Sequence, residues 1–408
     1  MARHSSRRST ADSAGAGQMK TARRVSMIIG LTLAVAAATT YITLFRVPAS
    51  AAPKVASHKA ITLLRLAEFT LASAPDSVQL DPDGTMVVVA TSDGKVNAWS
   101  TSRQRQHRSF ASVPDGTAVG SLYGNPLVFS PNGKELSVIG SSSSGGYYAY
   151  IWNVATGKAT SVPLPLISSP YPPPGYPNFV APGPNGLIAT SDPDGILGIV
   201  ATATGRLDAK FLLNRHGGIA YATSEPVFSP DGKTIAVSDD LGKIYLANAP
   251  RKHLAAALTA EKIYNTEWNM NGMVSFDIDT LTFSPDSKLI ACGSEIGIIR
   301  VWDARTGRNM SAFSVNGSAS GGAAARPVKT LVFSPDDKIL VSADNADSTV
   351  AIWDTASGRR VATLEAGTGN VASAAFTANG TLIVVTTSNN ASHHSIEIWI
   401  TGQSLQAG

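Results

Sequence analysis

The sequence predicts an all-β protein, a seven-bladed β-propeller of four-stranded antiparallel blades, preceded by one N-terminal transmembrane or signal helix. Three observations predict this fold class. A turn phrase recurs seven times at the spacing of propeller blades, short apolar strands follow each copy, and one long apolar run lies near the N-terminus. A spare strand before the first repeat indicates how the ring closes.

Composition agrees with many short strands joined by tight turns. Charged residues make up 15% of the 408 residues, and 36 residues are glycine. The formal net charge of +4 is concentrated in residues 1–24, which hold six basic side chains and one acidic one. The rest of the chain is therefore close to neutral, and no nucleic-acid partner is expected. Cys292 is the only cysteine, so it forms no intramolecular disulfide and is expected to be a small buried hydrophobe.

The N-terminal region predicts a membrane anchor. Residues 25–45 form an apolar run of about 21 residues without a charge, long enough for a helix that spans the hydrocarbon core. The basic tail, residues 1–24, precedes this run, so the positive-inside rule places the tail in the cytoplasm and the propeller outside. Residues 46–59 are rich in Ala, Pro and Ser and are expected to be a linker.

A cleaved signal peptide is the alternative to the anchor. Ala49-Ser50-Ala51 fits the small-residue pattern of a cleavage site just beyond the apolar run. Cleavage near Ala51 would make a secreted protein. Both interpretations place the bulk of the chain outside the cytoplasm.

The repeat is defined by a turn between two strands. Its fullest form is Val227-Phe228-Ser229-Pro230-Asp231-Gly232-Lys233, in which Pro fixes φ, Asp caps the turn and Gly accepts a positive φ. Six further copies match this phrase fully or in part. The aligned turn positions are Gly84, Gly133, Gly186, Gly232, Ser287, Asp337 and Gly380.

Each turn leads into an apolar strand and then into a strand that ends in an aromatic residue. Examples of the second strand are Val301-Trp302-Asp303 and Ile352-Trp353-Asp354, and Ile244-Tyr245 is assigned to the same place. A Thr-Gly-Lys/Arg-like turn follows, as in Thr306-Gly307-Arg308. The tryptophans are expected to pack between blades.

These phrases resemble the bacterial WD-repeat (WD40) family over about residues 60–408. The resemblance implies a propeller in which the two kinds of turn lie on one rim and the blade-to-blade connections lie on the other, which usually binds partners. The Gly-His pair of the family is missing from every copy, so its buried His–Asp–Ser–Trp hydrogen-bond network is not expected here. The third copy, residues 180–206, lacks both Phe and Trp.

The ring is expected to close with a strand from the N-terminal side. The last copy ends after its third strand, at Trp399, while a spare strand lies within residues 60–72. We expect this segment to be the outer strand of the seventh blade, because an unclosed propeller would leave open edges. The propeller then spans residues 60–402, and residues 403–408 form a tail.

The blade connections, near residues 103–127, 161–179, 253–280 and 309–328, are expected to carry the binding face. Two of them hold aromatic residues without strand periodicity, and such side chains often anchor protein interfaces. The candidate partner-binding residues are Tyr171, Tyr176, Tyr264 and Trp268. The alternative is that these rings cover the propeller, and the proline-rich run around Tyr171 is equally consistent with a stiff spacer.

No catalytic or cofactor-binding motif is found, including G-x-S-x-G, HExxH and a phosphate-binding glycine loop. No cofactor and no metal are expected; His393-His394 is assigned to a solvated loop. The sequence therefore favours a scaffold or sensor that binds a protein or peptide. The alternatives are an envelope glycan binder, and a hydrolase or lyase with distant His, Asp or Glu residues at the mouth of the channel.

Overall fold

The computed structural model describes most of the predicted propeller. The described residues are 61–102, 105–110, 118–119, 127–141, 146–165, 179–192, 195–213, 224–239, 242–259, 278–315, 326–343, 348–367, 369–390, 393–402 and 404–405. Residues 1–59 and 60–408 are two separate units, and the predicted tail, apolar run and linker of residues 1–59 lie outside the described residues. Within the described part, no helix is long and apolar enough to cross a membrane.

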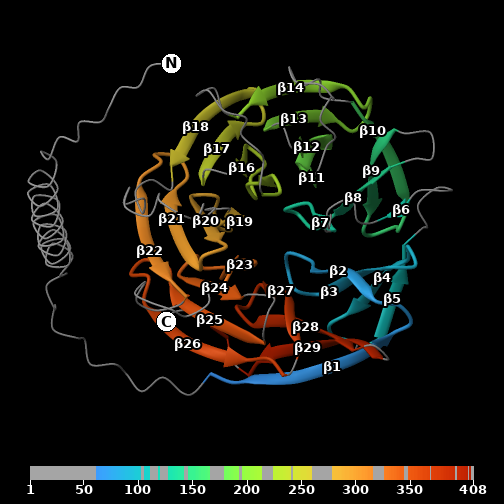
Figure 1. The fold of residues 1–408 in the computed structure, drawn as a ribbon, viewed down its shortest axis with the longest axis vertical. Coiled ribbons are helices and arrows are strands. Elements are labelled where there is room, and N and C mark those ends of the chain that lie inside the picture. Colours follow the sequence, from blue (N-terminus) through green and yellow to red (C-terminus); the bar gives the residue numbers. More distant parts are fainter. Residues whose placement is uncertain are drawn as a thin grey trace, which may run out of the picture. The chain divides into compact units, whose positions relative to one another are not determined.

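Seven antiparallel sheets form a ring around a central axis, as predicted (Figure 1). Within blades 1 to 6 the strands follow the chain from the axis outward. Blade 1 comprises β2 (Pro75–Leu80), β3 (Met86–Thr91), β4 (Val96–Ser100) and β5 (Arg105–Ser109). Blade 2 comprises β6 (Ala118–Val119), β7 (Val128–Phe129), β8 (Glu135–Ser141), β9 (Tyr147–Asn153) and β10 (Ala159–Leu164), with β6 and β7 both paired to β8. Blade 3 comprises β11 (Phe179–Pro182), the 3-10 turn η1 (Pro184–Gly186), β12 (Leu187–Ser191), β13 (Ile196–Ala201) and β14 (Leu207–Leu212).

The remaining blades repeat the same order. Blade 4 comprises β15 (Val227–Phe228), β16 (Thr234–Ser238), β17 (Lys243–Asn248) and β18 (His253–Thr259). Blade 5 comprises β19 (Ile278–Phe283), β20 (Leu289–Ser294), β21 (Ile298–Asp303) and β22 (Asn309–Ser314). Blade 6 comprises β23 (Thr330–Phe333), β24 (Ile339–Ala343), β25 (Thr349–Asp354) and β26 (Arg360–Glu365). Blade 7 comprises β27 (Asn370–Phe376), β28 (Leu382–Asn390), β29 (His393–Thr401) and, outermost, β1 (Leu63–Leu71).

The repeated turn phrase has the backbone geometry that its residues predict. All seven aligned turn positions have a positive φ, including 63° at Ser287 and 62° at Asp337, where the copy has no glycine. In blade 4, Ser229 Oγ donates to Asp231 Oδ1 at 2.6 Å and accepts the Thr234 N–H at 3.0 Å. The phrase therefore closes the turn through both its backbone and its side chains.

The ring closes through β1, as expected for the spare strand. β1 pairs antiparallel with β29 from Leu63 opposite Thr401 to Leu71 opposite His394. Figure 1 shows β1, in blue, along the outer edge of the last blade, in red. Arg65 reinforces the junction with ion pairs to Glu68 and to Glu397, at 2.9 and 3.0 Å. The start of the described chain thus completes the last sheet.

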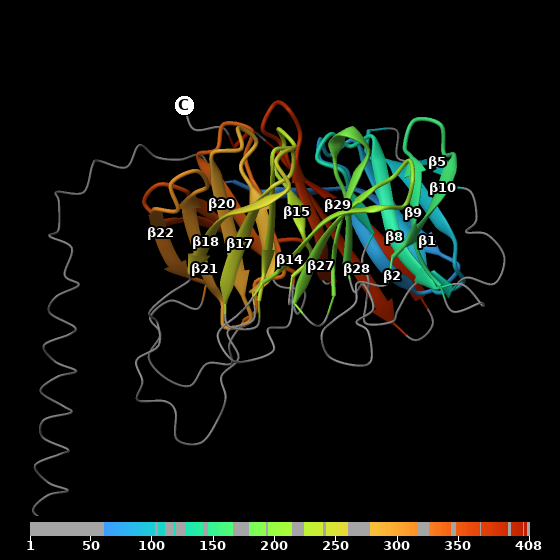
Figure 2. The ribbon, with the colours of Figure 1, turned by 90° about the horizontal axis from the view of Figure 1, so that it is seen from above.

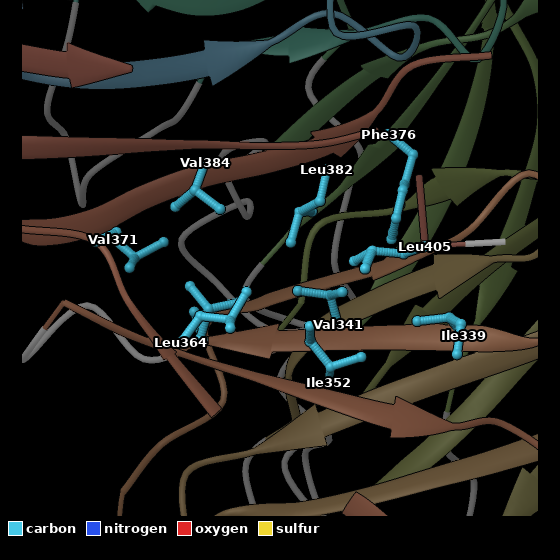
Figure 3. Close-up of a cluster of buried hydrophobic side chains, with 12 residues drawn as sticks. Ile339, Val341, Ile352, Leu364, Val371, Phe376, Leu382, Val384 and Leu405 are labelled. Carbon is cyan, nitrogen blue, oxygen red and sulfur yellow. The ribbon is translucent and has the colours of Figure 1, made fainter. Parts of the chain in front are cut away.

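Neighbouring blades are held together by apolar clusters. Between blades 6 and 7, Val341 and Ile352 face Leu382 and Val384, and Leu405 from the C-terminal end packs into the same cluster (Figure 3). The predicted tryptophans pack between blades. Phe313 of blade 5 stacks on Trp353 of blade 6 with ring centroids 4.8 Å apart, and other contacts of this kind are Phe69–Trp99 and Phe110–Trp152.

The Thr-Gly-Arg-like turns make a second contact between blades. A Cβ added to Gly358 would lie 2.6 Å from Phe313, on the outer strand of the preceding blade, and one on Gly307 would lie 2.9 Å from Leu258. In blade 4, Lys252 takes the left-handed position with φ 52°, and its Nζ forms an ion pair with Asp208 of blade 3 at 2.8 Å. Each such turn therefore rests on the blade before it.

Three details of the sequence interpretation were wrong. Ala247 pairs with Ile235 where Trp302 pairs with Ile290, so Tyr245 lies two residues before the tryptophan position. The ranges given for the blade connections were too wide, because outer strands such as β10 and β22 lie within them. His393 and His394 belong to strand β29 and not to a loop.

The expectation that the buried hydrogen-bond network is absent was also partly wrong. Trp353 Nε1 donates to Ser342 Oγ at 2.8 Å, and Trp399 Nε1 donates to Thr386 Oγ1 at 3.3 Å, so the Trp–Ser/Thr bond persists without histidine. In blade 4, Tyr245 OH donates instead to the buried Asp239 at 2.9 Å.

Candidate interaction surface

The ring has two different rims. In a four-stranded antiparallel blade, the first and third turns lie at one end of the strands and the second turn and the blade connection lie at the other. We call the first the turn rim, defined by the turns around Gly84, Gly232 and Gly307, and the second the connection rim, defined by the turns around Gly94 and Gly297. Figure 2 shows the ring edge-on, with the strands running between the two rims.

A cavity of about 380 Å³ lies on the axis of the ring. All seven innermost strands contribute to its wall, which is built mainly of Val, Phe, Leu, Ala and Pro side chains. The proline of the turn phrase is placed there in several blades, as Pro82, Pro131, Pro230 and Pro285. Regular recurrence of the phrase therefore produces an apolar ring near one mouth.

The channel wall does not supply an acid–base pair in the described part of the chain. Its charged lining residue is Asp81, accompanied by Thr282 among otherwise apolar or proline residues. The described residues also contain no group of three or more His, Cys, Asp and Glu that could hold a metal ion. The convergence of several titratable groups that a propeller hydrolase would use is not seen in this wall.

Asp81 stands where five of the other six turn phrases have Ser or Thr; the third has Gly183. It accepts the Met86 N–H at 2.9 Å and the Thr85 hydroxyl at 2.7 Å, and the same hydroxyl lies 2.9 Å from Asp83. Burial, with the adjacent Asp83, raises the pKa of Asp81 to about 7. Only a protonated Asp81 can donate to Asp83 as the Ser or Thr hydroxyl donates in five other blades.

Asp81 also borders a second cavity, of about 370 Å³, between blades 1 and 2 on the turn rim. Ser100, Ser102, His107 and Arg108 line this cavity together with Val154 and Ala155. Arg108 packs against Gly157 of the next blade, 3.2 Å from an added Cβ. Polar and apolar side chains contribute about equally to this cavity, whereas the axial channel is mainly apolar.

A second titratable group lies beside the channel wall. Glu225 precedes the wall residue Pro226, and although the residue as a whole keeps intermediate exposure, its carboxyl group is enclosed. Burial raises the pKa of Glu225 to about 7. Neither this residue nor Asp81 was singled out from the sequence; the aligned turn phrases do mark Asp81, which replaces serine, but nothing comparable marks Glu225.

The four aromatic residues chosen from the sequence, Tyr171, Tyr176, Tyr264 and Trp268, lie outside the described residues. They remain predictions for the connection rim. Cys292 is 3% exposed within the cluster between blades 4 and 5, and burial raises the pKa of its thiol to about 12. It is a buried apolar residue, as expected.

Comparison with known proteins identifies the repeat. The family described as "WD domain, G-beta repeat" matches residues 270–303 and 320–354, which include the first three strands of blades 5 and 6. The chain therefore contains WD40 repeats within a seven-bladed propeller.

Two plant proteins share stretches of this sequence. A guanine nucleotide-binding protein subunit beta from Arabidopsis thaliana is 31% identical over 85 residues, which are 21% of this chain and 22% of that protein. Periodic tryptophan protein 2 from Arabidopsis thaliana is 34% identical over 79 residues, which are 19% of this chain and 8% of that protein. Each match thus spans well under two thirds of the relative's own length.

Proposed function

We propose that this protein is an extracytoplasmic scaffold or sensor, held at a membrane by residues 25–45, whose connection rim binds a protein or peptide. WD40 propellers generally bind other proteins, and the apolar channel wall offers a binding surface more than a reaction centre. The conclusion depends most on one observation: β1 begins at Leu63 opposite Thr401, on the turn rim, so the chain enters the ring away from the connection rim.

A rigid ring suits this function. Seven sheets packed through buried apolar clusters fix the positions of the blade connections, so the loops of several blades can contribute to one surface. Preorganisation of this kind lowers the entropic cost of binding.

The test is affinity capture of partners by the full chain, made in its own cells with a C-terminal tag. The variant Tyr264→Ala/Trp268→Ala should lose a partner that the unchanged chain retains, since both residues belong to the connection between blades 4 and 5. Mass spectrometry of the captured chain also gives its mature N-terminus. A start near residue 52 would show cleavage, and a start at residue 1 or 2 would show a retained anchor.

The matched control changes the other rim. Arg206→Glu/Arg308→Glu alters two exposed residues of the turn rim and should retain the same partner. Loss of the partner from the control alone would place binding on the turn rim and contradict the proposal. Capture of no protein by any form would contradict protein binding and direct attention to an envelope glycan.

A further inference from the structure

The chain leaves the propeller for its N-terminal segment on the turn rim. Leu63 lies opposite Thr401 at the end of β29, and Gly402 N donates to Thr62 O at 3.2 Å. The C-terminal end lies on the same rim, where Leu405 N donates to Gly380 O at 2.8 Å. An anchor at residues 25–45 would therefore tether the chain from the turn rim and not from the connection rim.

The turn rim carries a repeated basic residue. The Thr-Gly-Lys/Arg-like turn ends at the start of each outer strand, where a long side chain projects into solvent. Exposed basic residues occupy this turn in blades 2 to 6: Lys158, Arg206, Arg251, Arg308 and Arg359. Lys158, Arg206, Arg308 and Arg359 follow the left-handed residue of their turns, whereas Arg251 precedes the left-handed Lys252 of blade 4.

The acidic residues of the same turns are hydrogen-bonded within the turns. Asp303 Oδ1 accepts the Thr306 N–H at 2.6 Å and the Thr306 hydroxyl at 2.7 Å, and these bonds lower the pKa of Asp303. Asp354 likewise accepts the Ser357 N–H at 2.8 Å. These carboxylates serve the turns, whereas the basic side chains face outward.

The described part of the connection rim carries more acidic than basic residues. Its described turns and strand ends carry Asp76, Asp93, Asp192, Asp239, Asp279 and Glu295 beside the basic residues Lys95, Lys243, Arg326 and Lys329. Asp93 pairs with Lys95 and Asp279 with Lys329, and Asp192 and Asp239 are buried. The turn rim also holds the exposed Asp83, Asp231 and Asp286 of the Pro-Asp-Gly turns, so the charge difference between the rims depends on the Thr-Gly-Lys/Arg-like turns. A molecule with this charge separation orients in the field of a charged surface.

We propose that the turn rim docks on an anionic lipid bilayer, using its ring of basic side chains and leaving the connection rim turned away for partners. The proposal rests on the membrane anchorage proposed above. A random-coil chain of the length of residues 46–59 has a root-mean-square end-to-end distance of roughly 20 Å. Attraction between Lys or Arg and anionic lipids acts within about a Debye length, roughly 10 Å at 0.1 M salt, so tether and charge act over comparable distances.

The experiment reads the orientation of the full chain in lipid nanodiscs. Cys292 is buried, so an introduced cysteine can be labelled selectively. One form carries a fluorophore at Ala356→Cys on the turn rim and the other at Glu295→Cys on the connection rim; both positions are exposed. The discs contain phosphatidylcholine alone or with phosphatidylglycerol, and a small fraction of lipid carries a nitroxide quencher on its headgroup.

We expect several-fold stronger quenching at position 356 than at 295 in anionic discs, and loss of the difference in neutral discs. Salt at about 1 M should abolish it as well, because the Debye length falls to about 3 Å. Arg206→Glu/Arg308→Glu/Arg359→Glu should abolish it too. The matched control Lys95→Glu/Lys210→Glu/Arg326→Glu makes the same charge change at exposed residues outside the turn rim and should preserve it.

Equal quenching at the two positions, stronger quenching at 295, or a difference that persists in neutral discs would overturn the proposal. Recovery of the chain with neutral discs separately tests the anchor. If neutral discs do not retain the chain, residues 25–45 are not an anchor. Docking by the turn rim then still predicts that anionic discs retain the chain and quench the label at position 356. Absence of retention or of quenching in anionic discs overturns docking as well.

Discussion

At the residue scale, Asp81 shows how one change in a repeated phrase alters local chemistry. In five of the other six blades a serine or threonine hydroxyl donates to the turn Asp or Asn, as Ser284 does to Asp286 at 2.8 Å. A carboxylate cannot donate, so blade 1 places two acidic groups at the same turn and lets Thr85 contact both. Burial then favours the protonated form of Asp81.

This arrangement predicts a pH-dependent stability. The folded-state pKa of Asp81, about 7, is above its ordinary value of 3.8, so folding favours the protonated form. Its stabilising contribution is complete below pH of about 4 and is lost as pH rises through about 7. Asp81→Ser should therefore raise the free energy of unfolding by about 1–2 kcal/mol at pH 8 and by much less at pH 5. Urea denaturation of both proteins at the two pH values measures this; an equal effect at both would refute the assignment.

At the scale of the element, the Thr-Gly-Arg-like turn has a role in packing that its sequence alone does not show. Its glycine has a positive φ, 67° at Gly358. The contact of that glycine with Phe313 depends on how neighbouring blades stack, which local pattern does not specify. Tyr245 was misplaced for a related reason, since register comes from cross-strand pairing.

Two glycines separate backbone strain from packing. Gly358 and Gly94 both have positive φ, but an added Cβ would approach Phe313 at 2.6 Å in the first case and meet nothing within 4 Å in the second. Gly94→Ala should lower the free energy of unfolding by about 1 kcal/mol through strain, and Gly358→Ala by about 1–2 kcal/mol more. Chemical denaturation of both variants measures the difference. Equal losses would show that the turn does not rest on the preceding blade.

At the scale of the whole molecule, the fold follows from the repeat more fully than the binding face does. Seven turn phrases and the spare strand of residues 60–72 were enough to predict the ring and its closure, because each copy carries its own turn chemistry and alternating apolar residues. The channel wall and Glu225 depend on residues from different blades brought together by the ring, and no local pattern marks them. The aromatic candidates of the connection rim lie outside the described residues.

Closure of the ring by β1 supports both proposals, since it places the tethered end on the turn rim. The most direct measurement is disulfide formation in Thr70→Cys/Ser395→Cys, two positions directly opposite in the β1–β29 register. Facing strand positions fall within the Cα separation that a disulfide requires. We predict rapid intramolecular oxidation, with the free energy of unfolding raised by about 2–4 kcal/mol. Thr70→Cys/Ser357→Cys, with the second cysteine on blade 6, should remain reduced. Failure of the first pair to oxidise in the folded protein, or equal oxidation of both pairs, would contradict the closed ring.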